Sequence, residues 1–219
     1  MNYYIDDTKF SLQDLKKRIK ETDLIPSRES LLESIDTIFK ELNKQGIKTL
    51  ADLRKQLKTP KSINAFSIKS NLDEKYLTML RREVESYFPK TFSINKFTWL
   101  SKKECEKLTT VGLNSTKKIY EALSRKDSLE NISVENKIDI SFLKSIFNLV
   151  DLTRIQWASP LFARMLFEAG YNSPQKIAQA DAEKLCSAID IINKKGKYFR
   201  GKIGLRDIKR LINSAKYVS

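Results

Sequence analysis

The residues of this sequence best suited to chemistry are cations gathered toward its C-terminal end. Residues 194–216 include nine basic residues and one acidic residue, Asp207, which give these 23 positions a net charge of +8. The whole chain of 219 residues has 41 Lys and Arg against 27 Asp and Glu, and so a net charge of +14. More than half of the net charge therefore lies in one short segment. Such a density favours binding to a polyanion.

Three glycines and two aromatic residues are interleaved with these cations, the pair Tyr198–Phe199 lying between Gly196 and Gly201. We expect a loop that enters a helix near Gly204, with the Gly201 to Gly204 backbone approaching a phosphate closely. The two rings either enter the core or stack on a base. The predicted phosphate ligands are Lys194, Lys195, Lys197, Arg200, Lys202 and Arg206. A solvated lysine-rich loop before an ordinary amphipathic helix is the alternative interpretation.

The other classes of functional residue are poorly represented. The chain has no histidine, which removes Ser-His-Asp and Cys-His catalysis and His-ligated zinc. Its two cysteines, Cys105 and Cys186, are too few for a zinc ribbon or a disulfide framework, and we expect both to be small buried apolar residues. The acidic residues do not converge. We therefore predict no catalytic residues, no metal, no cofactor and no enzymatic activity.

The elements that must position the basic segment are helices. Amphipathic stretches with helical period recur along the chain, and each of three isolated glycines ends one of them: Gly46, Gly112 and Gly170. An apolar residue, a polar residue and a hydroxyl N-cap follow each glycine, which is typical of a tight corner between two helices. Further helix starts are predicted at Ser11, Ser101, Ser159 and Asp181. The sequence predicts an all-α fold.

The helical corners recur at nearly constant spacing. Gly112 follows Gly46 by 66 residues, and the same offset superimposes a run of apolar positions without a gap. Gly170 follows Gly112 by 58 residues, and this offset places Trp99 on Trp157, both expected to fill the core between stacked units. We interpret the chain as three copies of one helical unit.

The predicted organisation is a leader helix followed by these three units, with short connections and rigid stacking. The boundaries are 1–23 for the leader, 24–90 and 91–150 for the first two units, and 151–219 for the third, which carries the basic hairpin. No apolar run is long enough for a membrane span, and the N-terminus lacks the pattern of a secretory signal. A cytoplasmic location is expected.

The phrase from Phe162 to Ser173, followed by Ile177-Ala178-Gln179-Ala180-Asp181, is similar to the helix-hairpin-helix pattern. Three tandem copies resemble the bacterial family described as domain of unknown function 4332, over most of the chain. The resemblance implies stacked helix-hairpin-helix-like (SAM-like) units. It also implies hairpins whose Gly-x-Gly backbone offers N–H groups to a nucleic-acid phosphate.

This sequence departs from that pattern at its first hairpins. Trp99 and Ser101, Trp157 and Ser159, and the phrase 25–27 stand where the glycines would lie. An indole at the point of closest approach obstructs a phosphate there, so the expected contact is the basic C-terminal unit. We expect non-enzymatic binding to nucleic acid without strong sequence preference, DNA being preferred over RNA as the partner. The alternative is a helical-repeat scaffold for protein–protein interaction, for which an acidic protein is the expected partner. A third hypothesis, the weakest, follows from the resemblance alone: helix-hairpin-helix units accompany lyases that act on damaged DNA, and Lys195 or Lys197 would be the amine nucleophile.

Overall fold

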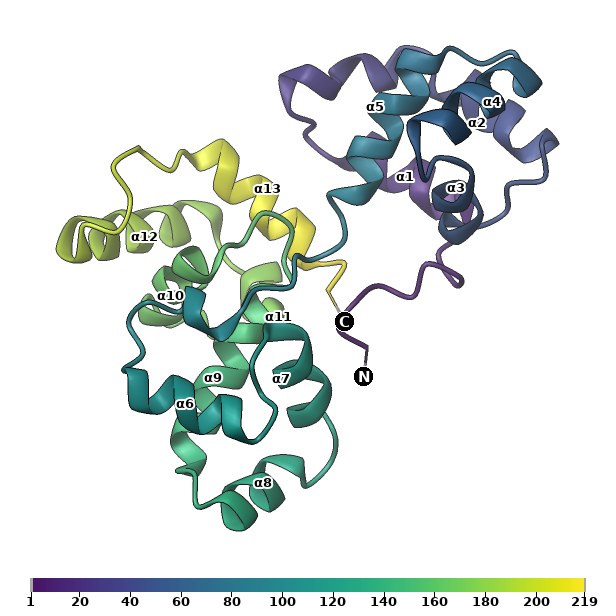
Figure 1. The fold of residues 1–219 in the computed structure, drawn as a ribbon. Coiled ribbons are helices and arrows are strands. Elements are labelled where there is room, and N and C mark those ends of the chain that lie inside the picture. Colours follow the sequence, from purple (N-terminus) through teal and green to yellow (C-terminus); the bar gives the residue numbers. More distant parts are fainter. Residues whose placement is uncertain (1, 219) are drawn as a thin grey trace. The chain divides into compact units, whose positions relative to one another are not determined.

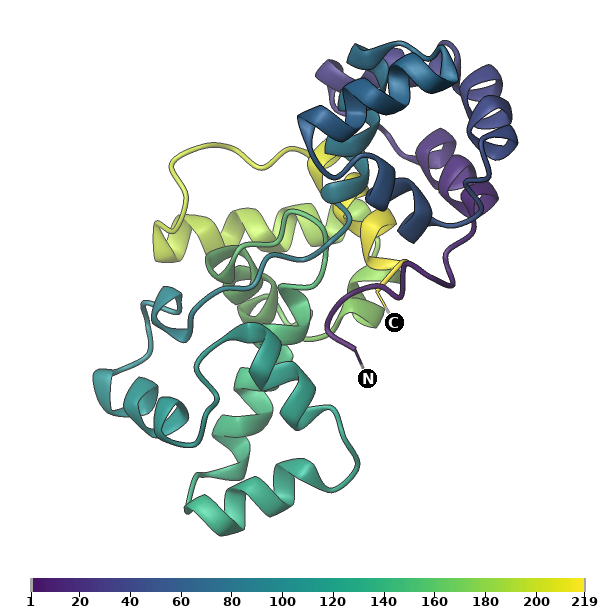
Figure 2. The ribbon, with the colours of Figure 1, turned by 45° about the vertical axis from the view of Figure 1, so that its right-hand side comes forward.

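The computed structural model describes residues 2–218, and these form an all-α fold with no β-strand among them. The chain divides into two compact units (Figures 1 and 2). The smaller unit comprises residues 5–88. The larger unit combines residues 2–4 with residues 89–218.

The smaller unit contains five α-helices and one 3-10 helix around a single core. Its elements are α1 (Leu12–Glu21), η1 (Pro26–Leu32), α2 (Ile35–Lys44), α3 (Leu50–Gln56), α4 (Pro60–Ser70) and α5 (Glu74–Glu85). Leucine and isoleucine from all of them fill the core, for example Leu15, Leu42 and Leu77, each fully buried.

The larger unit contains eight α-helices and one 3-10 helix. Its elements are η2 (Ile94–Lys96), α6 (Lys102–Thr110), α7 (Thr116–Leu123), α8 (Ser128–Asn136), α9 (Ile140–Leu152), α10 (Pro160–Glu168), α11 (Pro174–Ala178), α12 (Ala182–Gly196) and α13 (Leu205–Ala215). Two hydrophobic clusters make up its core. Phe167 on α10 packs against both of them, and α9 packs against α10, so the two clusters form one continuous body.

The N-terminal residues are part of the larger unit because Tyr3 is buried in it. The Tyr3 hydroxyl donates to the Lys90 carbonyl at 2.9 Å and lies 2.9 Å from the Thr116 Oγ1. The Arg154 Nε donates to the Tyr3 carbonyl at 3.2 Å, and burial raises the pKa of the Tyr3 hydroxyl. A buried polar side chain is tolerated only with partners, and Tyr3 has them.

The three predicted helical corners are confirmed. Gly46, Gly112 and Gly170 have φ of 84°, 81° and 87°, the left-handed region in which a side chain is strained. At each corner the glycine N–H donates three residues back, and the next N–H donates five residues back, as in a Schellman motif. Each corner then leads to a hydroxyl N-cap whose oxygen accepts a backbone N–H: Thr49, Ser115 and Ser173.

The predicted helix starts at Ser11, Ser101, Ser159 and Asp181 are also confirmed, since each side chain accepts a backbone N–H of the helix that follows. At Ser101 the arrangement is reciprocal, because Glu104 accepts from the Ser101 N–H at 2.7 Å. These caps satisfy donors that would otherwise be orphaned at the helix ends.

The prediction that both tryptophans fill the core is wrong for Trp157, which is 47% exposed. Ile155 and Ala158 enter the core on either side of it, and a hydrogen bond from the Ala158 N–H to the Ile155 carbonyl closes a turn. Trp157 has φ of 69° within this turn, and its indole lies at the surface. Trp99, in contrast, is partly buried against the core, with its ring centroid 5.2 Å from that of Phe97.

The two cysteines are less buried than expected. Cys105 and Cys186 are both partly exposed free thiols. Cys186 packs against the core, and its thiol lies 3.8 Å from the Ile203 carbonyl. Partial burial, and after it the neighbouring carboxylates of Glu104 and Glu106, raise the pKa of the Cys105 thiol.

Candidate nucleic-acid interface

The basic segment, residues 194–216, spans the end of α12, the loop 197–204 and the whole of α13, which packs against α12 (Figure 1). Lys197 ends α12 in the left-handed conformation, with φ of 51°. Gly204 is the N-cap of α13. The sequence prediction of a loop that enters a helix at Gly204–Leu205 is therefore confirmed.

An open hollow of about 630 Å³ lies at this loop, and we call it the basic hollow. Its lining comprises Asp190, Asn193, Lys194, Lys197, Phe199, Arg200, Gly201 and Lys202. Six of these are residues that the sequence singled out. The other predicted residues, Lys195, Tyr198, Gly204 and Arg206, lie outside its lining.

The cations of the basic hollow differ in how they are paired. The Lys194 Nζ lies 2.6 Å from an oxygen of Asp190, one helical turn earlier on α12. Lys197, Arg200 and Lys202 are exposed and have no ion-pair partner among residues 2–218. These three cations are already free to bind an anion, whereas Lys194 would first have to leave Asp190.

Phe199 is held at the rim of the basic hollow by the side chain of Asn193. The Phe199 N–H donates to the Asn193 Oδ1 at 2.8 Å, and the Asn193 Nδ2 donates to the Phe199 carbonyl at 2.9 Å. The ring itself is 53% exposed. An aromatic side chain is thus presented on a fixed backbone, next to free cations.

Tyr198 anchors the loop to α10. Its hydroxyl lies 3.0 Å from both carboxylate oxygens of Glu168, and its ring packs against the core. The Arg164 Nε donates to Glu168 at 2.6 Å, and its guanidinium lies over the rings of both Tyr198 and Trp99. Partial desolvation and the bond to Glu168 raise the pKa of Tyr198.

Two glycines of the segment make room for these rings. A Cβ on Gly196 would overlap the ring of Tyr198, and a Cβ on Gly201 would lie 2.6 Å from the Phe199 Cε1. A Cβ on Gly204 would meet only the Asp207 carboxylate, at 3.6 Å. The clustering of glycine, which the sequence suggested as a close approach to phosphate, thus has a packing reason at Gly196 and Gly201.

The N-terminus of α13 is already faced by a carboxylate. The Gly204 N–H donates to the Asp207 Oδ2 at 3.2 Å, and Asp207 also lies 3.7 Å from the Arg210 guanidinium. A negative side chain at this position accepts the Gly204 N–H and offsets part of the positive end of the helix dipole. The helix end is therefore a weaker anion site than the free cations of the loop.

Sequence reasoning missed Asn193, Asp190 and Glu168. Asn193 and Asp190 lie within a regular helix and carry no local signal that separates them from other surface residues. Glu168 is 30 residues from its partner Tyr198, so only the tertiary structure brings them together.

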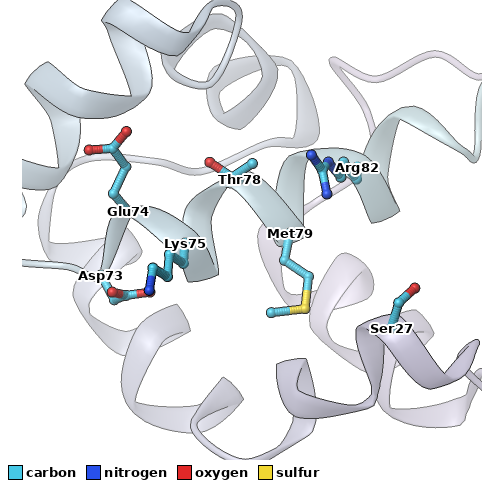
Figure 3. A pocket seen from close by; sticks show the side chains of 7 residues that line it. All are labelled: Ser27, Asp73, Glu74, Lys75, Thr78, Met79 and Arg82. Atoms are coloured by element: carbon cyan, nitrogen blue, oxygen red, sulfur yellow. The ribbon is translucent and has the colours of Figure 1, made fainter.

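A second hollow, of about 590 Å³, lies in the smaller unit between α5 and η1 (Figure 3). Two acidic and two basic side chains line it, and two of its residues have local structural roles. Asp73 caps α5 through the Tyr76 N–H at 2.6 Å, and the Ser30 hydroxyl donates to the Met79 sulfur at 3.4 Å. Because acidic and basic side chains balance, this hollow is a weaker candidate for a ligand-binding site than the basic hollow.

Within the described residues no group of three or more His, Cys, Asp or Glu side chains could hold a metal ion. In the same part of the chain, no helix is both long and apolar enough to cross a membrane.

Comparison with known families places the chain. A family model with the description Domain of unknown function (DUF4332) matches residues 99–218, which is more than half of the chain. The chain belongs to this family. The match contains the whole of the basic hollow. No curated protein and no solved structure matches the sequence significantly.

Proposed function

We propose that this protein is a non-enzymatic nucleic-acid-binding protein that contacts phosphates through the basic hollow, without strong sequence preference. The observation that carries the proposal is the gathering of three unpaired cations, Lys197, Arg200 and Lys202, around one open hollow. Lys or Arg side chains that are not already neutralised release counterions when they meet phosphates, and this release drives binding. DNA is the expected partner ahead of RNA.

The helical corners support a finer proposal about architecture, that the chain contains three tandem helix-hairpin-helix-like units. The three glycine corners share their backbone hydrogen bonds and their hydroxyl caps. The turns before α6 and α10 also share a hydrogen bond, from the Leu100 N–H to the Phe97 carbonyl and from the Ala158 N–H to the Ile155 carbonyl. These pairs are separated by the same offset of 58 residues that relates the two tryptophans.

The proposal is tested by fluorescence anisotropy with labelled random-sequence DNA, duplex and single-stranded, titrated with salt. We expect detectable binding at about 50 mM salt. The logarithm of the association constant should fall linearly with the logarithm of the salt concentration, with a slope of about 0.9 per phosphate contacted on duplex DNA. The triple variant Lys197→Gln, Arg200→Gln, Lys202→Gln should reduce this slope by roughly 2 to 3 on duplex DNA.

A matched control removes the same charge elsewhere. Lys58, Lys61 and Lys69 are exposed lysines of the smaller unit, and their triple replacement by Gln should leave the slope nearly unchanged. Equal losses from both triple variants would show that only the net charge matters. Undetectable binding at about 50 mM salt would refute the proposal. Capture of a protein partner that survives nuclease and roughly 0.5 M salt would instead favour the scaffold function, since salt screens phosphate contacts.

A further inference from the structure

The exposure of Phe199 has no explanation within the fold. Its neighbours Tyr198 and Ile203 pack against the core, whereas the Phe199 ring stands 53% exposed at the rim of the basic hollow. Leaving a large apolar ring in water costs free energy that burial would recover. Single exposed apolar side chains are common on protein surfaces, so it is the combination of this ring with the free cations of the same hollow that points to a ligand.

The ring is also preorganised. Two hydrogen bonds with the Asn193 side chain, one donated by it and one accepted, fix the Phe199 backbone, and the absence of a side chain at Gly201 lets the ring lie close to the chain. A phenylalanine has few rotatable bonds, so a ring on a fixed backbone loses little entropy when a ligand stacks on it.

The chemistry around the ring fits a nucleotide whose base is unpaired. The free cations Lys197, Arg200 and Lys202 line the same hollow as Phe199 and can hold the phosphates that flank a base. Proteins that bind single strands combine a positive groove with aromatic rings on which bases stack. In a duplex the bases are already stacked on one another, so an aromatic ring gains nothing from them unless the duplex is opened.

The N-terminus of α13 argues in the same direction. A duplex backbone is commonly held by free N–H groups at a helix N-terminus, and here the Gly204 N–H already donates to Asp207. With this N–H engaged and part of the helix dipole offset, the main contacts that the surface offers are side-chain cations and one exposed ring.

We infer that the basic hollow selects single-stranded over duplex nucleic acid, with a base stacked on Phe199 and the adjacent phosphates on Lys197, Arg200 and Lys202. This inference rests on the proposed function and specifies its substrate class.

The test compares three labelled DNA probes by anisotropy with the full chain: a 12-nucleotide oligothymidine, an abasic strand with the same number of phosphates, and a 12-base-pair duplex. We expect the oligothymidine to bind more tightly than the other two. Phe199→Ala should weaken its binding by between about fivefold and about a hundredfold, as expected for one stacked base. The same variant should leave binding to the abasic strand nearly unchanged.

Two further variants separate stacking from a general disturbance. Phe199→Trp should restore or exceed wild-type binding to oligothymidine, because a larger ring stacks at least as well. Ile191→Ala removes another exposed apolar side chain, 66% exposed on α12 and outside the lining of the basic hollow, and should have no effect.

The outcomes distinguish this inference from the proposal on which it rests. Equal binding of oligothymidine and the abasic strand, or an equal loss on all three probes from Phe199→Ala, would overturn the inference. Salt-dependent binding to those probes would leave the proposed function intact. If no probe binds at about 50 mM salt, both fail.

Discussion

Tyr198 and Glu168 lie 30 residues apart in the sequence, and the tyrosine hydroxyl lies 3.0 Å from both oxygens of the glutamate carboxylate. Glu168 also accepts a hydrogen bond from Arg164, whose guanidinium lies over the Tyr198 ring. Three side chains thus tie the loop 197–204 to α10. The position of the basic hollow depends on this attachment, although none of the three residues lines it.

Tyr198→Phe should loosen the loop without unfolding the larger unit. A partly exposed hydrogen bond to a carboxylate contributes on the order of 1 kcal/mol, and the ring would still pack beneath Arg164. We expect faster amide hydrogen exchange in residues 197–204 and little change elsewhere. Tyr171→Phe is the control, since the Tyr171 hydroxyl has no hydrogen bond among the described residues. Unchanged exchange in Tyr198→Phe would contradict the anchoring role.

Gly196→Ala should have opposite effects in two backgrounds. In the wild type the new Cβ would overlap the Tyr198 ring and displace it from Glu168, so we expect a lower free energy of unfolding. In Tyr198→Ala the obstacle is absent. The higher helix propensity of alanine at the end of α12 should then raise stability by about 0.5–1 kcal/mol. A double-mutant cycle by chemical denaturation measures the effect of Gly196→Ala on the free energy of unfolding in both backgrounds. The same effect in both backgrounds would exclude the steric explanation.

Gly170→Ala should destabilise the larger unit by about 1–2 kcal/mol, because φ of 87° is strained for any residue with a Cβ. Open space surrounds the position, so the cost comes from the backbone and not from a clash. Gly170→Asn should cost less, since asparagine tolerates this conformation. Both tryptophans belong to the larger unit and report its denaturation by fluorescence. Equal costs for Ala and Asn would contradict the backbone explanation.

The two aligned tryptophans should respond differently to substitution. Trp99→Ala removes packing against Phe97 and Arg164 and should destabilise the larger unit by roughly 2–3 kcal/mol, somewhat less than a fully buried ring. Trp157→Gly relieves a left-handed backbone while losing a half-exposed ring, so its effect should stay within about 1 kcal/mol. Thermal denaturation of both variants measures these changes in stability. A larger loss of stability from Trp157→Gly than from Trp99→Ala would contradict the conclusion that Trp99 is the better packed of the two.

Asp36 should titrate at unusually low pH. Hydrogen bonds from the ammonium groups of Lys16 and Lys20 hold the pKa of this carboxyl at about 2. The ionised form is favoured in the folded state, so its stabilising contribution is complete above the ordinary aspartate pKa of about 4 and is lost as the pH falls toward 2. Carboxyl chemical shifts measured by NMR give the midpoint directly. Replacing both lysines by Gln should return it to about 4, and a wild-type midpoint near 4 would contradict the pairing.

What the sequence predicted well was local. A glycine followed by an apolar residue, a polar residue and a hydroxyl specifies a helix end and a helix start within a few residues, and all three such corners are confirmed. The loop between α12 and α13 was predictable for the same reason. The cluster of cations, with the glycine and aromatic residues interleaved in it, also predicted six residues of the basic hollow, because they are close in sequence as well as in space.

What could not be predicted depends on contacts between distant residues. The alignment placed Trp157 on Trp99, yet Trp157 has a left-handed backbone and is half exposed, whereas Trp99 is partly buried against the core. The roles of Gly196 and Gly201 follow from where the rings of Tyr198 and Phe199 lie, and Tyr198 is held by a glutamate on another helix. The spacing of residues along the chain does not predict contacts between such distant partners.

The burial of Tyr3 has a topological consequence. The chain leaves the larger unit after Tyr4 and re-enters it at Pro89, and these points are neighbours, since Tyr3 donates to the Lys90 carbonyl and the Tyr4 hydroxyl lies 2.8 Å from the Thr91 Oγ1. Residues 5–88 are in this sense an insertion into a discontinuous domain, whose removal needs only a short glycine linker between its two ends. A fragment cut at the family boundary, in contrast, loses the tyrosine that fills the interior and leaves the buried Arg154 and Thr116 without it.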